Sequence, residues 1–185
     1  MVTERDKKIL DHINKYGFVT INQAIDMFFN NLSFAYDIAR RRLNKLADCG
    51  FVNKGKISVS NQNIYFINSK PSYQYILYMD FICKLIGRDC HIQELKFNTK
   101  IDNIPINIYV GFSKGEKDYL YAIDCEYFRK SKCMKKFIPL TDRENEAGIP
   151  LSIAVICDKN MRINNANCCK YKLINLELNN IAVLF

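Results

Sequence analysis

The chain has 185 residues, of which 49% are hydrophobic and 25% are charged, and this composition excludes a wholly disordered protein. No apolar run approaches the roughly 18 residues of a membrane span, and the polar N-terminus shows no secretory signal, so we expect a cytoplasmic protein without membrane association. The formal net charge of +8, from 27 basic and 19 acidic residues, favours an anionic partner such as nucleic acid.

The N-terminal residues predict two consecutive helices, each with a capping signal. Thr3 is expected to cap the first helix, with Asp6 in the position of a capping box. Gly17 accepts the left-handed turn that ends this helix. Thr20 begins the second helix, and Gln23 three residues later completes the pattern T-x-x-Q.

A third helix and a hairpin follow. Ser33 is expected to cap this helix, which runs to about residue 48 and carries a stripe of apolar residues on one side. The stripe contains Ala35, Ala39, Leu43 and Leu46. Residues 51–59 and 64–67 then predict two strands, joined by a polar tip at residues 60–63.

Three helices followed by a hairpin are typical of a winged helix-turn-helix domain, which we assign to residues 1–69. In that domain the third helix enters the major groove, where arginine recognises guanine and asparagine recognises adenine, while the hairpin contacts the DNA backbone. The expected contacts are Ser33, Asp37, Arg40, Arg41, Asn44 and Lys45 on the third helix, and Lys54, Lys56, Asn61, Gln62 and Asn63 on the hairpin. Arg42 lies on the flank. Two other interpretations are a solvated charged face and a protein-interaction module.

Three runs of this region resemble the replication-relaxation family, the winged-helix proteins of plasmids and integrated mobile elements. The runs are TERDKKIL from Thr3, FVTINQ from Phe18 and ARRRLNKLADCGFV from Ala39, and together they span about a third of the chain. The resemblance implies a double-stranded DNA-binding protein that controls replication, transfer, partition or transcription of a bacterial mobile element.

The remaining residues, 70–185, predict an α+β domain. A helix is expected over residues 75–86, either packed within the chain or forming a dimer with a second copy. Strands are expected over residues 92–97, 104–112, 119–125, 151–157 and 171–178. This domain would mediate homodimerisation, bind a protein partner, or add DNA contacts through a second basic patch. The patch contains Arg129, Lys130, Lys132, Lys135 and Lys136.

The resemblance further implies a nuclease-like fold in this domain, with a Pro-Asp on one strand and Glu-x-Asp on the next. The counterparts here, Pro105-Ile-Asn107 and Asp124-Cys-Glu126, match that pattern incompletely, since Asn107 replaces an aspartate. Asp124 and Glu126 share one strand face, and we expect them to face solvent without catalysing a reaction. A metal-dependent nuclease that uses these two carboxylates is the first alternative function, and an adaptor that does not bind DNA is the second.

No cofactor or metal site is expected. The eight cysteines contain no C-x-x-C pair, and reduced cysteines in a cytoplasmic protein pack as small apolar residues. Of the two histidines, His12 is expected to face solvent or to pack at the edge of the first helix. His91 follows Cys90 on a strand, where adjacent side chains point to opposite faces, so the two form no nucleophile–base pair.

Overall fold

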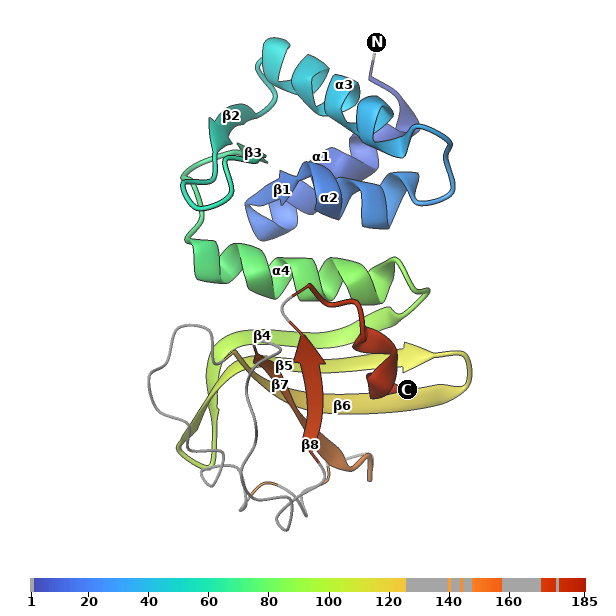
Figure 1. The fold of residues 1–185 in the computed structure, drawn as a ribbon, viewed down its shortest axis with the longest axis vertical. Coiled ribbons are helices and arrows are strands. Elements are labelled where there is room, and N and C mark those ends of the chain that lie inside the picture. The colour runs from blue at the N-terminus through green and yellow to red at the C-terminus, as the bar shows by residue number, and fades with distance from the viewer. Residues whose placement is uncertain (1, 126–139, 141–143, 145–147, 158–170, 176) are drawn as a thin grey trace. The chain divides into compact units, whose positions relative to one another are not determined.

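The computed structural model describes residues 2–125, 140, 144, 148–157, 171–175 and 177–185, and it confirms a mixed α+β fold. The chain divides into two compact units, Met1–Gly87 and Arg88–Phe185 (Figure 1). The division therefore falls later in the chain than the boundary expected between residues 69 and 70, because one further helix packs into the first unit.

The first unit begins with helices whose ends follow the local sequence signals. Helix α1, Glu4–Tyr16, has the reciprocal capping box of Thr3 and Asp6, and it ends at Gly17 with a φ of 89°. Helix α2, Ile21–Ala24, begins with the second reciprocal capping box, formed by Thr20 and Gln23. It continues as a π-helical segment, η1, Ile25–Phe29. Both capping predictions are confirmed.

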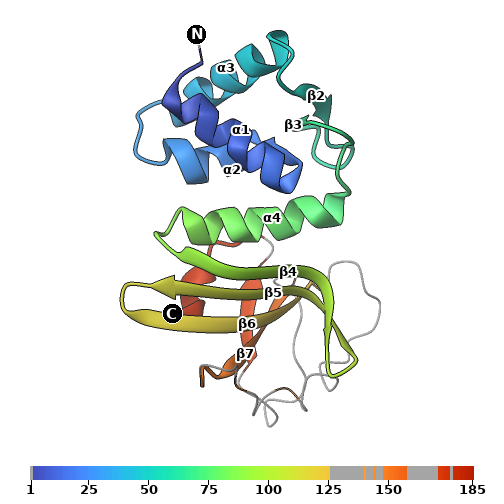
Figure 2. The ribbon, with the colours of Figure 1, turned by 180° about the vertical axis from the view of Figure 1, so that it is seen from behind.

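Helix α3, Ala35–Asp48, packs against α1 and α2 (Figure 1, Figure 2). Its apolar stripe is confirmed in large part, since Ala39 and Leu43 are fully buried and Leu46 is 4% exposed. These side chains meet Ile9 and Ile13 of α1 in one core cluster. The helices therefore contact one another through their apolar faces, which leaves the opposite face of α3 outside this core.

The predicted hairpin is present as part of a three-stranded antiparallel sheet. Strand β2, Asn53–Lys56, pairs with β3, Asn63–Phe66, and β3 also pairs with the short strand β1, Phe18–Thr20. Residues 57–59 were expected to continue the first strand, but the strand ends at Lys56 and the turn begins directly after it. The strand gives way to a turn at Ile57, whose backbone N–H donates to the oxygen of Gln62 at 2.9 Å and whose backbone oxygen accepts from the N–H of Asn61 at 2.8 Å.

Helix α4, Tyr73–Ile86, is the helix that moves the division between the units. Its N-cap is Ser72, whose hydroxyl accepts a hydrogen bond from the backbone N–H of Tyr75 at 3.2 Å. The amide Nε2 of Gln23 donates to Asp80 Oδ1 of α4 at 2.7 Å. Lys84 forms an ion pair with Asp26 of η1 at 2.8 Å. These contacts support packing within the chain, the first of the two placements considered for this helix. None of the helices that the structure describes is long and apolar enough to cross a membrane.

The second unit contains a five-stranded mixed sheet of order β4-β5-β6-β7-β8. Its strands are β4, His91–Ile101; β5, Ile104–Lys114; β6, Lys117–Cys125; β7, Leu151–Cys157; and β8, Tyr171–Asn175. The first three strands form an antiparallel meander, and the parallel strands β7 and β8 extend it. A short 3-10 helix, η4, Ile181–Leu184, follows. All five expected strands are present, although the last one ends at residue 175 and not at 178.

Candidate nucleic-acid interface

The outward face of α3 carries three cations in exposed positions. Arg40, Arg41 and Lys45 are exposed, together with Asp37, while the stripe on the other side of the helix is buried. A helix has about 3.6 residues per turn, so positions 37, 41, 44 and 45 lie close together on this surface. The residues that the sequence predicted as major-groove contacts on α3 are thus on one face of a single helix, with Ser33 as the exception.

The two guanidinium groups of this face contact only their own helix among the described residues. Arg40 lies 3.5 Å from the carboxylate of Asp37, and Arg41 donates from Nε to the backbone oxygen of Asp37 at 3.3 Å. A single exposed ion pair of this kind contributes well under about 1 kcal/mol. Both groups can therefore leave these contacts for an external partner at little energetic cost.

Arg42, the next residue, is held inside the first unit. It donates from Nε to Oδ1 of Asp6 at 3.0 Å and forms a second hydrogen bond with Oδ2 of the same carboxylate. It also donates to the hydroxyl of Thr3 at 3.2 Å. Burial raises the pKa of Asp6, but the hydrogen bonds from Arg42 and Thr3 outweigh it, and the pKa is lowered. Arg42 therefore links α3 to the N-terminus of α1.

Asn44 is only half-buried, and its carbonyl oxygen accepts a hydrogen bond from the hydroxyl of Tyr65 at 2.9 Å. Tyr65 lies on β3, so this bond attaches the sheet to α3. The predicted recognition residue thus also has a structural contact. Its side-chain NH₂ group can still donate to an external acceptor, since the bond uses only the oxygen.

Ser33 does not cap α3, and that prediction is wrong. The N-cap is Phe34, which adopts the left-handed conformation with a φ of 58° and makes no side-chain capping bond. The chain reaches the helix through this left-handed residue, so the helix begins later than the Ser33 hydroxyl requires. Ser33 remains exposed beside the helix start.

The tip of the hairpin carries the remaining predicted contacts. Lys54, Lys56, Asn61 and Gln62 are exposed, and Asn63 is half-buried opposite Lys56. Two backbone hydrogen bonds close the turn, from Ile57 to Gln62 at 2.9 Å and from Asn61 to Ile57 at 2.8 Å. The hairpin therefore presents two lysines and two amides on a turn held by its own backbone.

A group of exposed apolar residues lies beside this face and was not predicted from the sequence. Leu32, Phe34 and Tyr36 are 36%, 82% and 54% exposed. Tyr36 precedes Arg40 by one helical turn and lies outside the buried stripe. The helical period contains a signal for Tyr36, which falls outside the apolar stripe, but no local signal marks Phe34, because its exposure depends on the left-handed backbone.

In the second unit, the carboxylate predicted to face solvent is buried. Asp124 is 1% exposed on β6, and Asn107 of β5 is 4% exposed. The carbonyl oxygen of Asn107 accepts a hydrogen bond from the backbone N–H of Cys125 at 2.8 Å. The prediction failed because Asp124 lies in the middle of the sheet, paired with Val155 of β7. Glu126 and the basic residues 129–136 lie outside the described residues.

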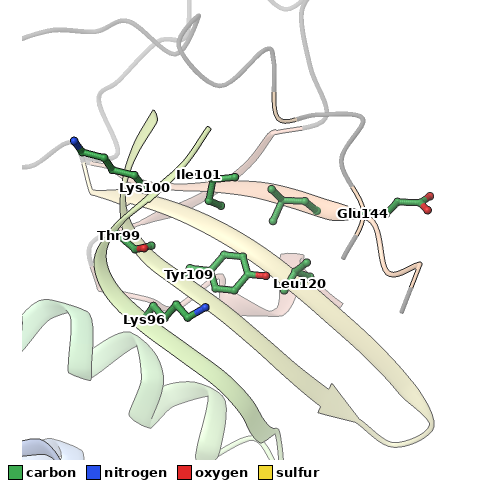
Figure 3. A pocket seen from close by; sticks show the side chains of 8 residues that line it. Lys96, Thr99, Lys100, Ile101, Tyr109, Leu120 and Glu144 are labelled. Atoms are coloured by element: carbon green, nitrogen blue, oxygen red, sulfur yellow. The ribbon is translucent and has the colours of Figure 1, made fainter. Parts of the chain in front are cut away.

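A groove of about 250 Å³ lies on the same unit, lined by the sheet and by Glu144 (Figure 3). Lys96 contributes its ammonium group, which is already paired with Glu94 at 2.7 Å. Lys100 and Tyr109 are further polar groups of this groove. Within the part of the chain that the structure describes, no three histidine, cysteine or acidic side chains gather to hold a metal ion.

Comparison with known proteins finds no matching family model, no similar curated protein and no similar solved structure.

Proposed function

We propose that the first unit is a winged helix-turn-helix domain that binds double-stranded DNA and recognises its sequence with α3. The observation that carries this proposal is that three consecutive arginines of α3 have different partners. Arg42 binds the carboxylate of Asp6, whereas Arg40 and Arg41 are exposed and, among the described residues, form their ion pair and hydrogen bond with Asp37 of their own helix. A charged face that binds nothing would also be exposed. It would, however, give no reason for bulky apolar side chains to be exposed beside it.

The dimensions and chemistry of this face suit the major groove. Fourteen residues of α-helix are about 21 Å long, and the groove of B-DNA, roughly 12 Å wide, admits one helix. Each guanidinium can donate two hydrogen bonds to O6 and N7 of guanine, which no other base pair accepts in that arrangement. Lys54 and Lys56 on the hairpin can neutralise phosphates without reading the sequence.

We expect Arg40→Ala and Arg41→Ala each to weaken binding to the preferred site by about 1–3 kcal/mol, which is roughly fivefold to 150-fold. The preferred DNA site is first identified by letting the full chain select duplexes from two pools. One pool contains random sequences, and the other contains genomic fragments of the mobile element that the resemblance implies. Arg41→Lys keeps the charge but loses the two-pronged donor, so it should retain binding to random duplex while losing preference for the selected one.

Lys8→Ala is the matched control, because it removes one exposed cation from α1 and leaves α3 intact. Its affinity for the selected duplex should stay within about twofold of that of the unaltered chain. If both arginine-to-alanine variants bind the selected duplex as tightly as the unaltered chain, α3 is not the recognition helix. If no duplex is enriched at low salt, the DNA-binding proposal itself fails.

Lys56→Ala should weaken binding to every duplex by a similar factor. The lysine lies on the hairpin and is exposed, where it would contact phosphate and not a base edge. The slope of log affinity against log salt concentration should fall by about 1, since one fewer counterion is released. Measuring affinity for selected and random duplexes at several salt concentrations tests this, and a change in the ratio of the two affinities contradicts it.

A further inference from the structure

Phe34 combines two features that do not favour stability. Its φ of 58° lies in the left-handed region, where a bulky residue is a true outlier and its backbone is strained. Its side chain is 82% exposed, the highest value among the large hydrophobic residues described. Burial of the ring thus does not offset the backbone strain, and a glycine or asparagine would adopt this conformation more easily.

The strained residue stands at the N-terminal end of the proposed recognition helix. Leu32 and Tyr36 are exposed on either side of it, and residues 30–33 before it are all exposed. Arg40 and Arg41 follow within two turns on the same helix. The exposed carboxylate of Asp37 lies between this apolar group and the arginines, but the three cations of the outward face of α3 outnumber it. A partner must therefore offer apolar contacts within negatively charged surroundings.

The major groove of A·T-containing DNA has this combination. Each thymine presents a C5-methyl group to the groove, flanked by phosphates of both strands, and phenylalanine is one of the side chains that contact it. A second protein copy would carry the same cations and would repel them. Charge complementarity therefore favours DNA over a copy of this chain as the occupant of this surface.

We propose that Phe34 is a specificity-determining residue that contacts the methyl group of thymine when α3 lies in the major groove, with Tyr36 beside it. This inference rests on the proposed DNA-binding function. Phe34 has a left-handed backbone and leaves its ring exposed outside the protein core, at the end of the helix that the proposal places in the groove. The chain should therefore prefer sites with thymine next to the bases that Arg40 and Arg41 read.

The test compares two forms of the duplex selected by the unaltered chain, one with thymine and one with deoxyuridine at every thymine position. The two differ only in C5-methyl groups. The unaltered chain should bind the thymine form about threefold to tenfold more tightly, as expected for burial of one or two methyl groups. Replacing single thymines by deoxyuridine then locates the contact.

Phe34→Asn removes the ring but suits the left-handed backbone, so the variant should fold at least as well as the unaltered chain. We expect it to bind both duplex forms equally and to keep the salt dependence of the unaltered chain. Phe51→Asn is the matched control, because Phe51 is 47% exposed just beyond the other end of α3, and it should keep the preference for thymine.

If Phe34→Asn still prefers the thymine duplex as strongly as the unaltered chain does, the inference is wrong while the DNA-binding proposal stands. It is also wrong if Phe34→Asn abolishes self-association in sedimentation and leaves the thymine preference unchanged, because the surface is then a dimer contact. Failure of the unaltered chain to bind any duplex is a different result, and it overturns the proposed function.

Discussion

Arg42→Ala is expected to lower the free energy of unfolding by about 3 kcal/mol, whereas Arg41→Ala changes it by less than about 0.5 kcal/mol. The Asp6 side chain is only 2% exposed and the Arg42 side chain 27% exposed. Removing the guanidinium leaves a buried carboxylate with no compensating cation. Among the described residues, Arg41 makes one exposed hydrogen bond, to the backbone of Asp37 in its own helix, so its removal costs little stability.

Urea unfolding of the two variants at pH 7 measures this difference, and the adjacent position of the two arginines makes each a control for the other. The DNA-binding assay should show the reverse order when performed at a temperature where both variants are folded. Equal unfolding midpoints would show that the pair with Asp6 does not stabilise the first unit. Because the pKa of Asp6 is lowered in the folded state, its contribution should be present at neutral pH and lost as the pH falls through that lowered value.

His12→Phe is expected to stabilise the protein in acid relative to the unaltered chain, by up to about 3 kcal/mol near pH 4. The imidazole, expected to face solvent or to pack at the edge of the helix, is buried at 8% exposure between Tyr16 and Phe28, with ring centroids at 4.8 and 6.1 Å. Burial, and to a lesser degree the charge of Lys15, lowers the pKa of His12 from 6.5 to about 4. The unfolded chain therefore binds a proton that the folded chain does not, and stability falls as the pH decreases from about 6.5 to 4.

A second buried group acts in the opposite direction over the same range. Burial raises the pKa of Asp80 from 3.8 to about 6, although the hydrogen bond from Gln23 opposes this shift. The folded state therefore takes up a proton before the unfolded state does, and this group stabilises the protein as the pH falls from about 6 to 4. The unaltered chain should consequently show a weaker acid dependence than either group alone would produce.

Thermal unfolding of the unaltered chain, His12→Phe and Asp80→Asn between pH 4 and pH 7 separates the two groups. His12→Phe should gain stability relative to the unaltered chain as the pH falls, and it should be at least as stable at pH 7, because Nε2 of His12 has no hydrogen-bond partner among the described residues. Asp80→Asn should lose stability relative to the unaltered chain as the pH falls, because the variant cannot gain from protonation of Asp80. A difference between His12→Phe and the unaltered chain that is constant over this range would mean that the imidazole titrates normally.

Features with a local cause were predictable. The capping boxes of Thr3 and Thr20 each join residues three positions apart, so the sequence pattern contains both partners. The alternation of apolar residues likewise predicted strands β5 and β6, which are antiparallel neighbours in the sheet. Helix α3 shows the limit of such signals, since its apolar stripe was correct while its start at Phe34 was not.

Features that depend on distant partners were not predictable. In the sequence, Asp124 cannot be distinguished from a carboxylate on the protein surface. It is buried because β6 lies between β5 and β7 in the sheet. The period of the first helix allowed His12 to face solvent or to pack at the edge of the helix. In the folded chain it is buried by packing against Phe28 of η1. Burial is a property of the assembled elements, and one strand or helix does not contain that information.

The three consecutive arginines of α3 show most clearly the difference between what local sequence determines and what tertiary contacts determine. Composition, charge and helical period were enough to predict an amphipathic third helix with a basic outward face, because these depend on neighbours within a few residues. The helical period placed Arg42 on the flank, but only the folded chain shows that it binds Asp6, because Asp6 lies 36 residues earlier and reaches Arg42 through the packing of α1 against α3. The reason is physical: a helix determines the direction in which a side chain points, and the tertiary structure determines what that side chain meets.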